Sequence, residues 1–199
     1  VPAEHILCGA GGDEIIDLIG RVCVQDGDAI IDLPPTFGMY KWLADILHAR
    51  YVAVPRRADF SIDIDAVIKT AHDTPNARML FVANPNNPDG SVTPRADLLK
   101  LLALPLMVVI DEAYIDFSHT ESLAPLVAEH DNLIVLRTFS KLAGLAGMRV
   151  GYGIFARNVI KHLWKVKQPY TPNVAGSIAA IASLNDQDWL AAGVRNIVA

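Results

Sequence analysis

The chain has 199 residues, of which 52% are hydrophobic and 20% are charged, and its formal net charge is -5. This composition is ordinary for one globular domain, and the negative balance excludes the basic surface that nucleic-acid-binding proteins carry. The longest apolar run, at 101–110, is interrupted by Pro105 and is too short to span a bilayer. The first residues lack the basic and apolar segments of a signal peptide, so we expect a cytoplasmic location.

Short apolar runs alternate with amphipathic stretches along the whole chain. A short strand or a loop is expected at 5–8, and strands at 29–33, 51–55, 78–83, 106–111, 133–136 and 150–155. Helices are expected at 15–24, 37–47, 64–71, 94–103, 157–166 and 173–184. Asp63, Thr93 and Asp186 are expected to cap the helices that follow them.

The alternation of strands and helices predicts an α/β fold, with three α/β/α layers around a mainly parallel sheet. Wholly apolar runs such as 106–110 are typical of strands that are buried on both faces. We expect residues 1–185 to form one large domain and residues 186–199 to begin a helix that leads toward a second, smaller domain. Both ends of the sequence are abrupt, which suggests a piece of a longer protein.

The two cysteines, Cys8 and Cys23, fall in no CxxC pattern and in no Cys/His cluster. This spacing indicates no zinc site, and we expect no metal at all. We interpret both as buried thiols of a protein from a reducing compartment.

Unusual polar residues follow several of the expected strands. Asp111 ends one strand, the turn at 84–90 follows another, and the segment 138–141 follows a third, while the glycines at 11–12 precede a helix. Because ligands of open parallel sheets collect at the carboxyl ends of strands, these residues predict one binding site.

The residue types in this site suit pyridoxal phosphate (PLP). A carboxylate at Asp111 would favour the protonated form of the pyridine nitrogen, which makes the ring an electron sink. An unprotonated amine at Lys141 would form a Schiff base with the aldehyde and later move the substrate's proton. Small and apolar neighbours of Lys141 suggest a partly dry site.

The phosphate of such a cofactor needs donors and positive charge. Arg149 offers a two-pronged grip, and the hydroxyls of Thr138 and Ser140, two residues apart, would point the same way from an extended segment. Backbone N–H groups after Gly11 and Gly12 suit an anion, with the Asp13 side chain capping the helix. Three further side chains complete the expected site: Asn87 and Tyr114 would donate to the ring's phenolate oxygen, and Phe37 would stack on the ring.

These motifs resemble those of fold-type I PLP-dependent aminotransferases of class I and II, and most closely the histidinol-phosphate group of that family. The resemblance covers nearly the whole chain and rests on Gly-Gly-Asp-Glu (11–14), Pro-Pro-Thr-Phe-Gly-Met-Tyr (34–40), Asn-Pro-Asn-Asn-Pro-Asp-Gly (84–90), Asp-Glu-Ala-Tyr (111–114), Arg-Thr-Phe-Ser-Lys (137–141), Ala-Gly-Met-Arg-Val-Gly (146–151) and Pro-Tyr (169–170).

The resemblance implies a role for each matched residue. Lys141 would be the Schiff-base lysine, and Asp111 the partner of the pyridine nitrogen. Asn87 and Tyr114 would hold the phenolate oxygen, with Tyr114 also counted among the catalytic residues, and Phe37 would occupy the ring-stacking position. The remaining matched residues would form the phosphate cup: Gly12, Asp13, Glu14, Thr138, Ser140 and Arg149.

The resemblance also implies an activity and an assembly. The family reaction moves the amino group from L-histidinol phosphate to 2-oxoglutarate, or from glutamate in reverse, as a step of histidine biosynthesis. Members have a large domain with a mainly parallel seven-stranded sheet, a small domain built from both chain ends, and homodimeric sites. Neither a nucleic acid nor a membrane is expected as a partner.

Three departures from the family pattern affect these expectations. Asp89 stands where Thr is usual, although Asp also suits turns. Phe37 lacks the hydroxyl of the tyrosine that is common there. The sequence lacks the regions that supply the substrate-carboxylate arginine and the partner's phosphate-site tyrosine, so we expect a formed PLP cup with weakened or absent transamination.

Two other functions stay open at this point. A PLP-dependent lyase such as a threonine-phosphate decarboxylase would share this cup, and a PLP-binding domain without activity would retain it. A dinucleotide-binding domain is disfavoured, because the glycines at 9–12 do not form GxGxxG with an acidic residue about 20 positions on.

Overall fold

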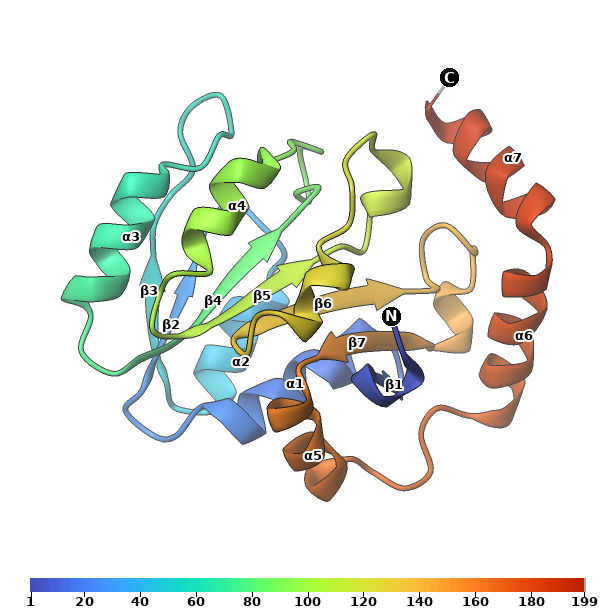
Figure 1. Cartoon of the computed structure of the whole chain (residues 1–199), viewed down its shortest axis with the longest axis horizontal. Helices are drawn as coiled ribbons and strands as arrows, with labels where there is room; N and C mark the ends of the chain where they lie inside the picture. Colours follow the sequence, from blue (N-terminus) through green and yellow to red (C-terminus); the bar gives the residue numbers. More distant parts are fainter. Residues whose placement is uncertain (199) are drawn as a thin grey trace.

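The computed structural model describes residues 1–198, and its centre is a seven-stranded sheet with the order β1-β7-β6-β5-β4-β2-β3 (Figure 1). The strands are β1 (Ile6–Gly9), β2 (Ala29–Asp32), β3 (Arg50–Ala53), β4 (Ala77–Ala83), β5 (Met107–Asp111), β6 (Leu133–Thr138) and β7 (Gly151–Phe155). Strands β2 to β6 pair in parallel, whereas β7 is antiparallel to both β6 and β1. The mainly parallel sheet is therefore confirmed.

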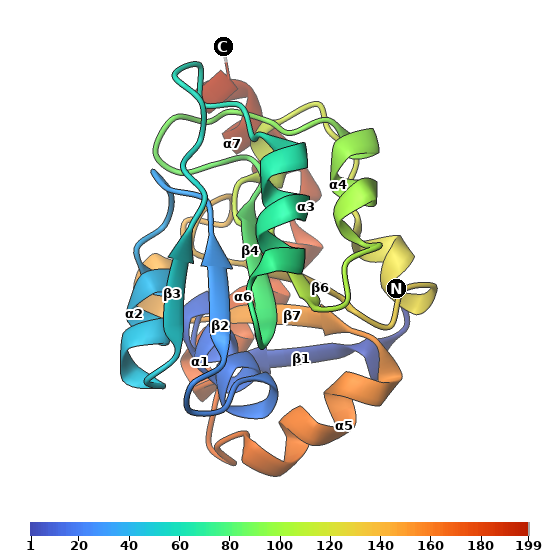
Figure 2. The same ribbon diagram turned by 90° about the vertical axis from the view of Figure 1, so that its left-hand side faces the viewer.

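Helices cover both faces of the sheet, which gives the predicted three layers (Figure 2). The helices are α1 (Gly12–Cys23), α2 (Met39–Ile46), α3 (Ile64–Asp73), α4 (Arg95–Leu101), α5 (Arg157–Val166), α6 (Val174–Asn185) and α7 (Gln187–Val198), with short 3-10 helices at Ala3–His5, Ile115–Phe117, Ala124–Ala128 and Ala146–Met148. Helices α3 and α4 pack on one face, and α1, α2 and α5 on the other.

The alternation of side chains along each strand explains the two cores. In β5, Val108 and Ile110 join the cluster under α3 and α4, whereas Val109 joins the cluster under α1 and α2. The wholly apolar run thus marks a strand covered on both sides, as predicted. Because both faces are covered, only the strand ends are left for polar chemistry.

Helices α6 and α7 lie beside the layered body, at the right of Figure 1. Helix α7 packs against the 3-10 helix Ile115–Phe117. The division into domains 1–185 and 186–199 stays a prediction. Across residues 1–198, no helix combines the length and the apolar character needed to cross a membrane.

Several element ends differ from the prediction. Helix α1 begins at Gly12, before its first apolar residue, and β6 continues through Thr138. Asp63 caps α3 as expected, and Asp186 accepts the Trp189 N–H in the first turn of α7. The prediction that Thr93 caps α4 is wrong, because Pro94 occupies the N-cap position of that helix. Instead, the Thr93 N–H donates to the side chain of Asn84 at 2.7 Å.

The prediction that both thiols are buried is wrong for Cys8. Cys8 is exposed because β1 is an edge strand whose side chains alternate, with Leu7 turned into the core. Cys23 is partly buried, and burial raises its pKa to about 11. Neither thiol forms a disulfide.

Candidate functional site

Three neighbouring parallel strands bring their carboxyl ends together at one edge of the sheet. Asp111, the last residue of β5, pairs in register with Ala83 of β4 and Leu136 of β6. The turn that carries Asn87 follows β4, and the segment that carries Lys141 follows β6. The predicted convergence at strand ends is therefore present.

Two small cavities surround Asp111 and Lys141, and both residues line each of them. One cavity has a volume of about 170 Å³, and it is lined by Gly12, Asp13, Ile16, Phe37, Asp111, Ala113, Leu136, Arg137, Thr138, Ser140, Lys141, Ala146 and Arg149. The other, called the inner cavity below, has a volume of about 60 Å³, and it is lined by Phe37, Tyr40, Ala83, Pro85, Asn87, Asp111, Ala113, Tyr114 and Lys141. All the predicted site residues except Glu14 thus line one cavity or the other.

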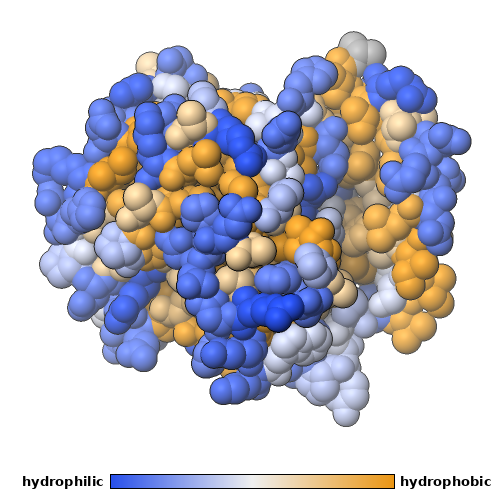
Figure 3. Space-filling model, viewed as in Figure 1, coloured by the Kyte–Doolittle hydropathy of each residue, from blue (hydrophilic) through white to orange (hydrophobic). Residues whose placement is uncertain are grey.

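A larger hollow opens outside these cavities. It has a volume of about 860 Å³ and shares Asn87, Tyr114 and Lys141 with the smaller cavity. Figure 3 shows the molecular surface hollowed between α7 and the body. Ile197 of α7 and Phe117 line this outer space.

Asp111 is buried, and donors hold both of its oxygens. Its Oδ1 accepts the Ala113 N–H at 3.0 Å, and its Oδ2 accepts the Tyr40 hydroxyl at 2.8 Å. Burial raises the pKa of Asp111, while these two bonds and the charge of Lys141 oppose the rise. A buried carboxylate of this kind favours a cationic N–H partner in the cavity, because such a partner stabilises its charged form.

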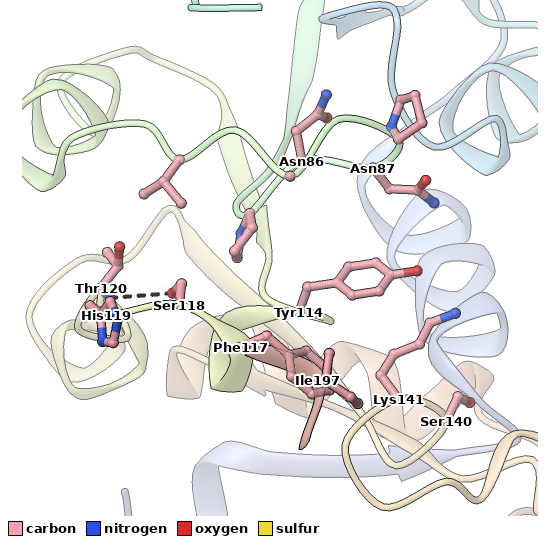
Figure 4. Close-up of a pocket in the computed structure, with 14 residues that line it drawn as sticks. Asn86, Asn87, Tyr114, Phe117, Ser118, His119, Thr120, Ser140, Lys141 and Ile197 are labelled. Atoms are coloured by element: carbon pink, nitrogen blue, oxygen red, sulfur yellow. Dashed lines mark hydrogen bonds between the residues drawn. The ribbon is translucent and has the colours of Figure 1, made fainter. Parts of the chain in front are cut away.

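Lys141 lies against the ring of Tyr114, with Nζ 5.1 Å from the ring centroid. In Figure 4 the amine of Lys141, the hydroxyl of Tyr114 and the amide of Asn87 point toward one space. The expectation of a partly dry environment is not met within residues 1–198, because the Lys141 side chain is exposed on the surface segment after β6.

Groups that could hold an anion line the 170 Å³ cavity, and they are called the anion site below. Arg149, Thr138 and Ser140 line it together with the first residues of α1. The Ser140 N–H donates to Thr138 Oγ1 at 3.1 Å. Asp13 does not cap α1 as expected, because its Oδ2 pairs with Arg149 Nη2 at 2.7 Å. An entering anion therefore competes with Asp13 for the guanidinium.

Glycines allow the parts of this anion site to meet. Gly11 has φ +88°, and a methyl group there would collide with the guanidinium of Arg149. A methyl group on Gly151 would lie 2.5 Å from the backbone of Gly11 and Gly12. Strand β7 and the start of α1 thus touch through bare backbone. The contact made by Gly151 was not predicted, although this glycine ends the Gly-Met-Arg-Val-Gly motif.

The turn at 84–90 is tied to the loop that carries Phe37. The Asn86 side chain donates to Pro35 O at 3.0 Å and accepts the Thr36 hydroxyl at 2.8 Å. Asp89 accepts the Ser91 N–H at 3.0 Å, so Asp in place of Thr supports the turn. These bonds hold the Asn87 turn and the Phe37 loop against each other across the cavity.

Glu14 is the one predicted site residue that the structure does not bring to these cavities. Its carboxylate accepts the Ala10 N–H and the Thr171 hydroxyl, the latter at 2.9 Å. Glu14 therefore braces the loop before α1. Tyr40, in contrast, was not predicted as a site residue and lines the inner cavity. Its place in the motif 34–40 was visible, but its contact with Asp111 was not.

The arrangement suits a small planar ligand with three distinct ends. Asp111 would accept a ring N–H, Lys141 would meet an electrophilic carbon, and Arg149 with the α1 start would hold an anionic tail. Asn87 and Tyr114 supply donors between these ends.

Sequence comparisons identify related proteins. A family model described as aminotransferase class I and II matches residues 1–198. Histidinol-phosphate aminotransferase from Roseiflexus castenholzii is 50% identical over 198 residues, which cover 100% of this chain and 53% of that protein. The chloroplastic histidinol-phosphate aminotransferase of Nicotiana tabacum is 49% identical over 189 residues, covering 94% of this chain and 45% of the relative.

Solved structures agree with the sequence matches. The crystal structure of histidinol-phosphate aminotransferase from Sinorhizobium meliloti in complex with pyridoxal-5'-phosphate superposes with a TM-score of 0.90 at 29% identity. The match covers 96% of this chain and 53% of that one. The chain thus spans about half the length of the curated relatives that it matches.

Proposed function

Because the chain belongs to the family of class I and II aminotransferases, we propose that it forms the cofactor-binding body of a PLP-dependent aminotransferase. The observation that carries this proposal is the pair of cavities that join the amine of Lys141 to the buried carboxylate of Asp111. The relative of known structure that binds pyridoxal-5'-phosphate supports the choice of cofactor.

The residues present fit this cofactor. Asp111 would face the ring nitrogen, and Lys141 the aldehyde. Asn87 and Tyr114 would donate to the phenolate oxygen, while Phe37 would lie against the ring. The phosphate would be held by the donors of the anion site, namely the N–H groups of Gly12 and Asp13, the hydroxyls of Thr138 and Ser140, and Arg149.

Bound PLP would supply an electron sink for the α-carbon of an amino substrate. The chain's own residues would prepare and use that property. The negative charge of Asp111 would keep the ring nitrogen protonated, and the Asp13–Arg149 pair would exchange for a phosphate–Arg149 pair. The Lys141 amine, which reaches the open side of the cavity, would carry the proton to and from the substrate carbon.

We propose L-histidinol phosphate and 2-oxoglutarate as the substrates, as a step of histidine biosynthesis. Identities of 49% and 50% with histidinol-phosphate aminotransferases support this choice. The outer hollow of about 860 Å³ beside Lys141 is large enough for a substrate of this class.

A homodimer is the assembly that we propose. Along α6, four apolar side chains lie 53–76% exposed, namely Val174, Ile178, Ile181 and Leu184, and Figure 3 shows apolar atoms gathered at this edge of the molecule. An exposed apolar stripe of this kind is typical of an interface. A cytoplasmic location stays a prediction, and the plant relatives are named as chloroplastic.

Product analysis with the purified protein and added PLP tests the proposal. Because weakened or absent transamination is expected of this chain, L-histidinol phosphate and 2-oxoglutarate should react slowly at most. Any products should be glutamate and the ketone that corresponds to the amino donor, in equal amounts. Release of carbon dioxide from L-threonine phosphate, without glutamate, would instead identify a lyase. Tight cofactor binding without turnover of either substrate would identify a binding domain that needs further protein to act.

A further inference from the structure

Tyr40 is a buried link between two walls of the inner cavity. Its side chain is 0% exposed, and its hydroxyl donates to Asp111 Oδ2 at 2.8 Å. The ring stacks on Phe81 of β4, with centroids 4.4 Å apart and planes 9° apart. Because the stack lies inside the core, the position of the hydroxyl is fixed relative to the strand that precedes the Asn87 turn.

The same ring also supports Phe37. The two rings meet edge to face, with centroids 5.7 Å apart at an angle of 82°. One side chain thus contacts both the acid at the end of β5 and the aromatic wall of the cavity. Tyr40 lines the inner cavity and contacts both residues, so it can fix their positions from within the core.

We propose that Tyr40 is a positioning residue that keeps the Asp111 carboxylate ionised and oriented toward the ring nitrogen of the cofactor. This inference rests on the proposed function, because it assigns a purpose to the hydrogen bond within that site. The bond itself is a property of the protein without cofactor, and it can be tested there.

Hydrogen-bond geometry explains how Tyr40 acts. A carboxylate has two lone pairs on each oxygen, and one on each accepts the Ala113 N–H or the Tyr40 hydroxyl. Asp111 also lines both cavities, so a further lone pair is available to a donor placed there. Without the hydroxyl, Oδ2 would lose its buried donor, and the carboxyl group would gain by taking up a proton. Protonation would remove the negative charge that stabilises a cationic ring N–H.

The charges around the pair act in both directions. Burial raises the pKa of Asp111, the nearby charge of Asp13 adds to the rise, and Lys141 opposes it. Burial, followed by the charge of Asp111, raises the pKa of Tyr40, with Asp32 adding to the rise and Arg56 opposing it. Tyr40 therefore remains a protonated donor at neutral pH, whereas Asp111 depends on that donor to stay ionised.

A second tyrosine–aspartate pair on the same sheet provides a matched control. The Tyr51 hydroxyl of β3 donates to Asp32 Oδ2 of β2, also at 2.8 Å. Asp32 is buried and does not line either cavity with Asp111. Tyr51→Phe removes the same kind of bond from the same sheet and leaves the Asp111 pair intact.

The test is a carbon-13 NMR titration of the aspartate carboxyl groups in the cofactor-free protein, with Asp111 assigned by Asp111→Asn. We expect Tyr40→Phe to move the titration of Asp111 to higher pH, and Tyr51→Phe to leave it in place. In a folded Tyr40→Phe variant, an unmoved titration of Asp111 would overturn the proposal. An equal movement in Tyr51→Phe would also overturn it.

A second substitution keeps the test decisive if Tyr40→Phe does not fold. Site-specific 3-fluorotyrosine at position 40 retains the ring and makes the hydroxyl a stronger donor, so the titration of Asp111 should move to lower pH. No movement would reject the proposal.

Cofactor binding separates this inference from the proposed function. In Tyr40→Phe, the dissociation constant of PLP should rise about tenfold at neutral pH, with a greater loss at acidic pH. If Tyr40→Phe moves the titration of Asp111 but the wild-type protein binds no PLP, the proposed function alone is refuted. If the wild-type protein binds PLP but Tyr40→Phe leaves the titration of Asp111 in place, this inference alone is refuted.

Discussion

Replacing Gly151 by alanine tests how closely β7 and the start of α1 must approach. A methyl group at Gly151 would lie 2.5 Å from backbone atoms of Gly11 and Gly12, whereas ordinary contact begins at 3.4 Å. The backbones must therefore separate by 3.4 − 2.5 = 0.9 Å or more. Neither partner is a flexible side chain, so we expect destabilisation of about 1–3 kcal/mol from overpacking.

The same movement should weaken the anion site. A shift of this size carries a hydrogen bond of about 2.9 Å beyond the range of useful bonds, and each lost bond to a charged group costs about 1.5–3 kcal/mol. For one lost bond, the dissociation constant of PLP should rise by about 10- to 100-fold. Fluorescence titration with PLP and with pyridoxal, which lacks the phosphate, separates this effect from general damage.

Gly147→Ala is the matched control, because a methyl group there meets nothing within 4 Å. It should leave the affinity for both ligands unchanged. In Gly151→Ala, the loss should be large for PLP and small for pyridoxal. Equal losses for the two ligands, or an unchanged affinity for PLP in a folded variant, would show that the close contact at Gly151 does not position the phosphate donors.

Three other substitutions test the roles of Asp111, Arg149 and Glu14. Asp111→Asn should raise the melting temperature of the cofactor-free chain at neutral pH and weaken PLP binding. Burial raises the pKa of Asp111 above its usual value, so its stabilising contribution is complete below the usual pKa and is lost as pH rises through the folded-state pKa. A gain in stability on the order of 1 kcal/mol in Asp111→Asn corresponds to a rise of about 2–4 °C in melting temperature, measured by calorimetry. The gain should shrink toward acidic pH, and a gain independent of pH would contradict this explanation. Arg149→Lys should weaken inorganic phosphate and PLP by about tenfold in equilibrium titrations, because Lys cannot form the two-pronged grip; an unchanged affinity would exclude Arg149 from the anion site. Glu14→Gln should leave PLP affinity within about twofold, since Glu14 lies outside the cavities, and a tenfold loss would return it to the site.

The sequence was sufficient to predict most of the sheet and the strand-end position of Asp111. The run Leu106–Ile110 is apolar on both faces and then ends in a carboxylate, so a buried strand with a polar end is the one reading that satisfies both features. The segment with Thr138, Ser140 and Lys141 was found for the same reason. The local sequence pattern is enough to predict a residue's place at a strand end when the burial of the strand decides that place.

Contacts between distant segments were not predictable in this way. Tyr40 and Asp111 are 71 residues apart, and nothing local shows that one reaches the other. Asp13 was assigned to capping because a helix start favours it, but Arg149, 136 residues away, binds its side chain instead. Thr93 fits the local preference for a cap, yet Asn84 takes its N–H from outside the helix.

The most direct measurement of the central claim is the site at which PLP attaches. The protein is incubated with equimolar PLP, reduced with borohydride, digested and examined by mass spectrometry, alongside Lys141→Arg. We predict one dominant pyridoxyl-modified peptide, which contains Lys141, and its loss in the variant. Modification spread evenly over surface lysines, or the same dominant product in Lys141→Arg, would contradict it.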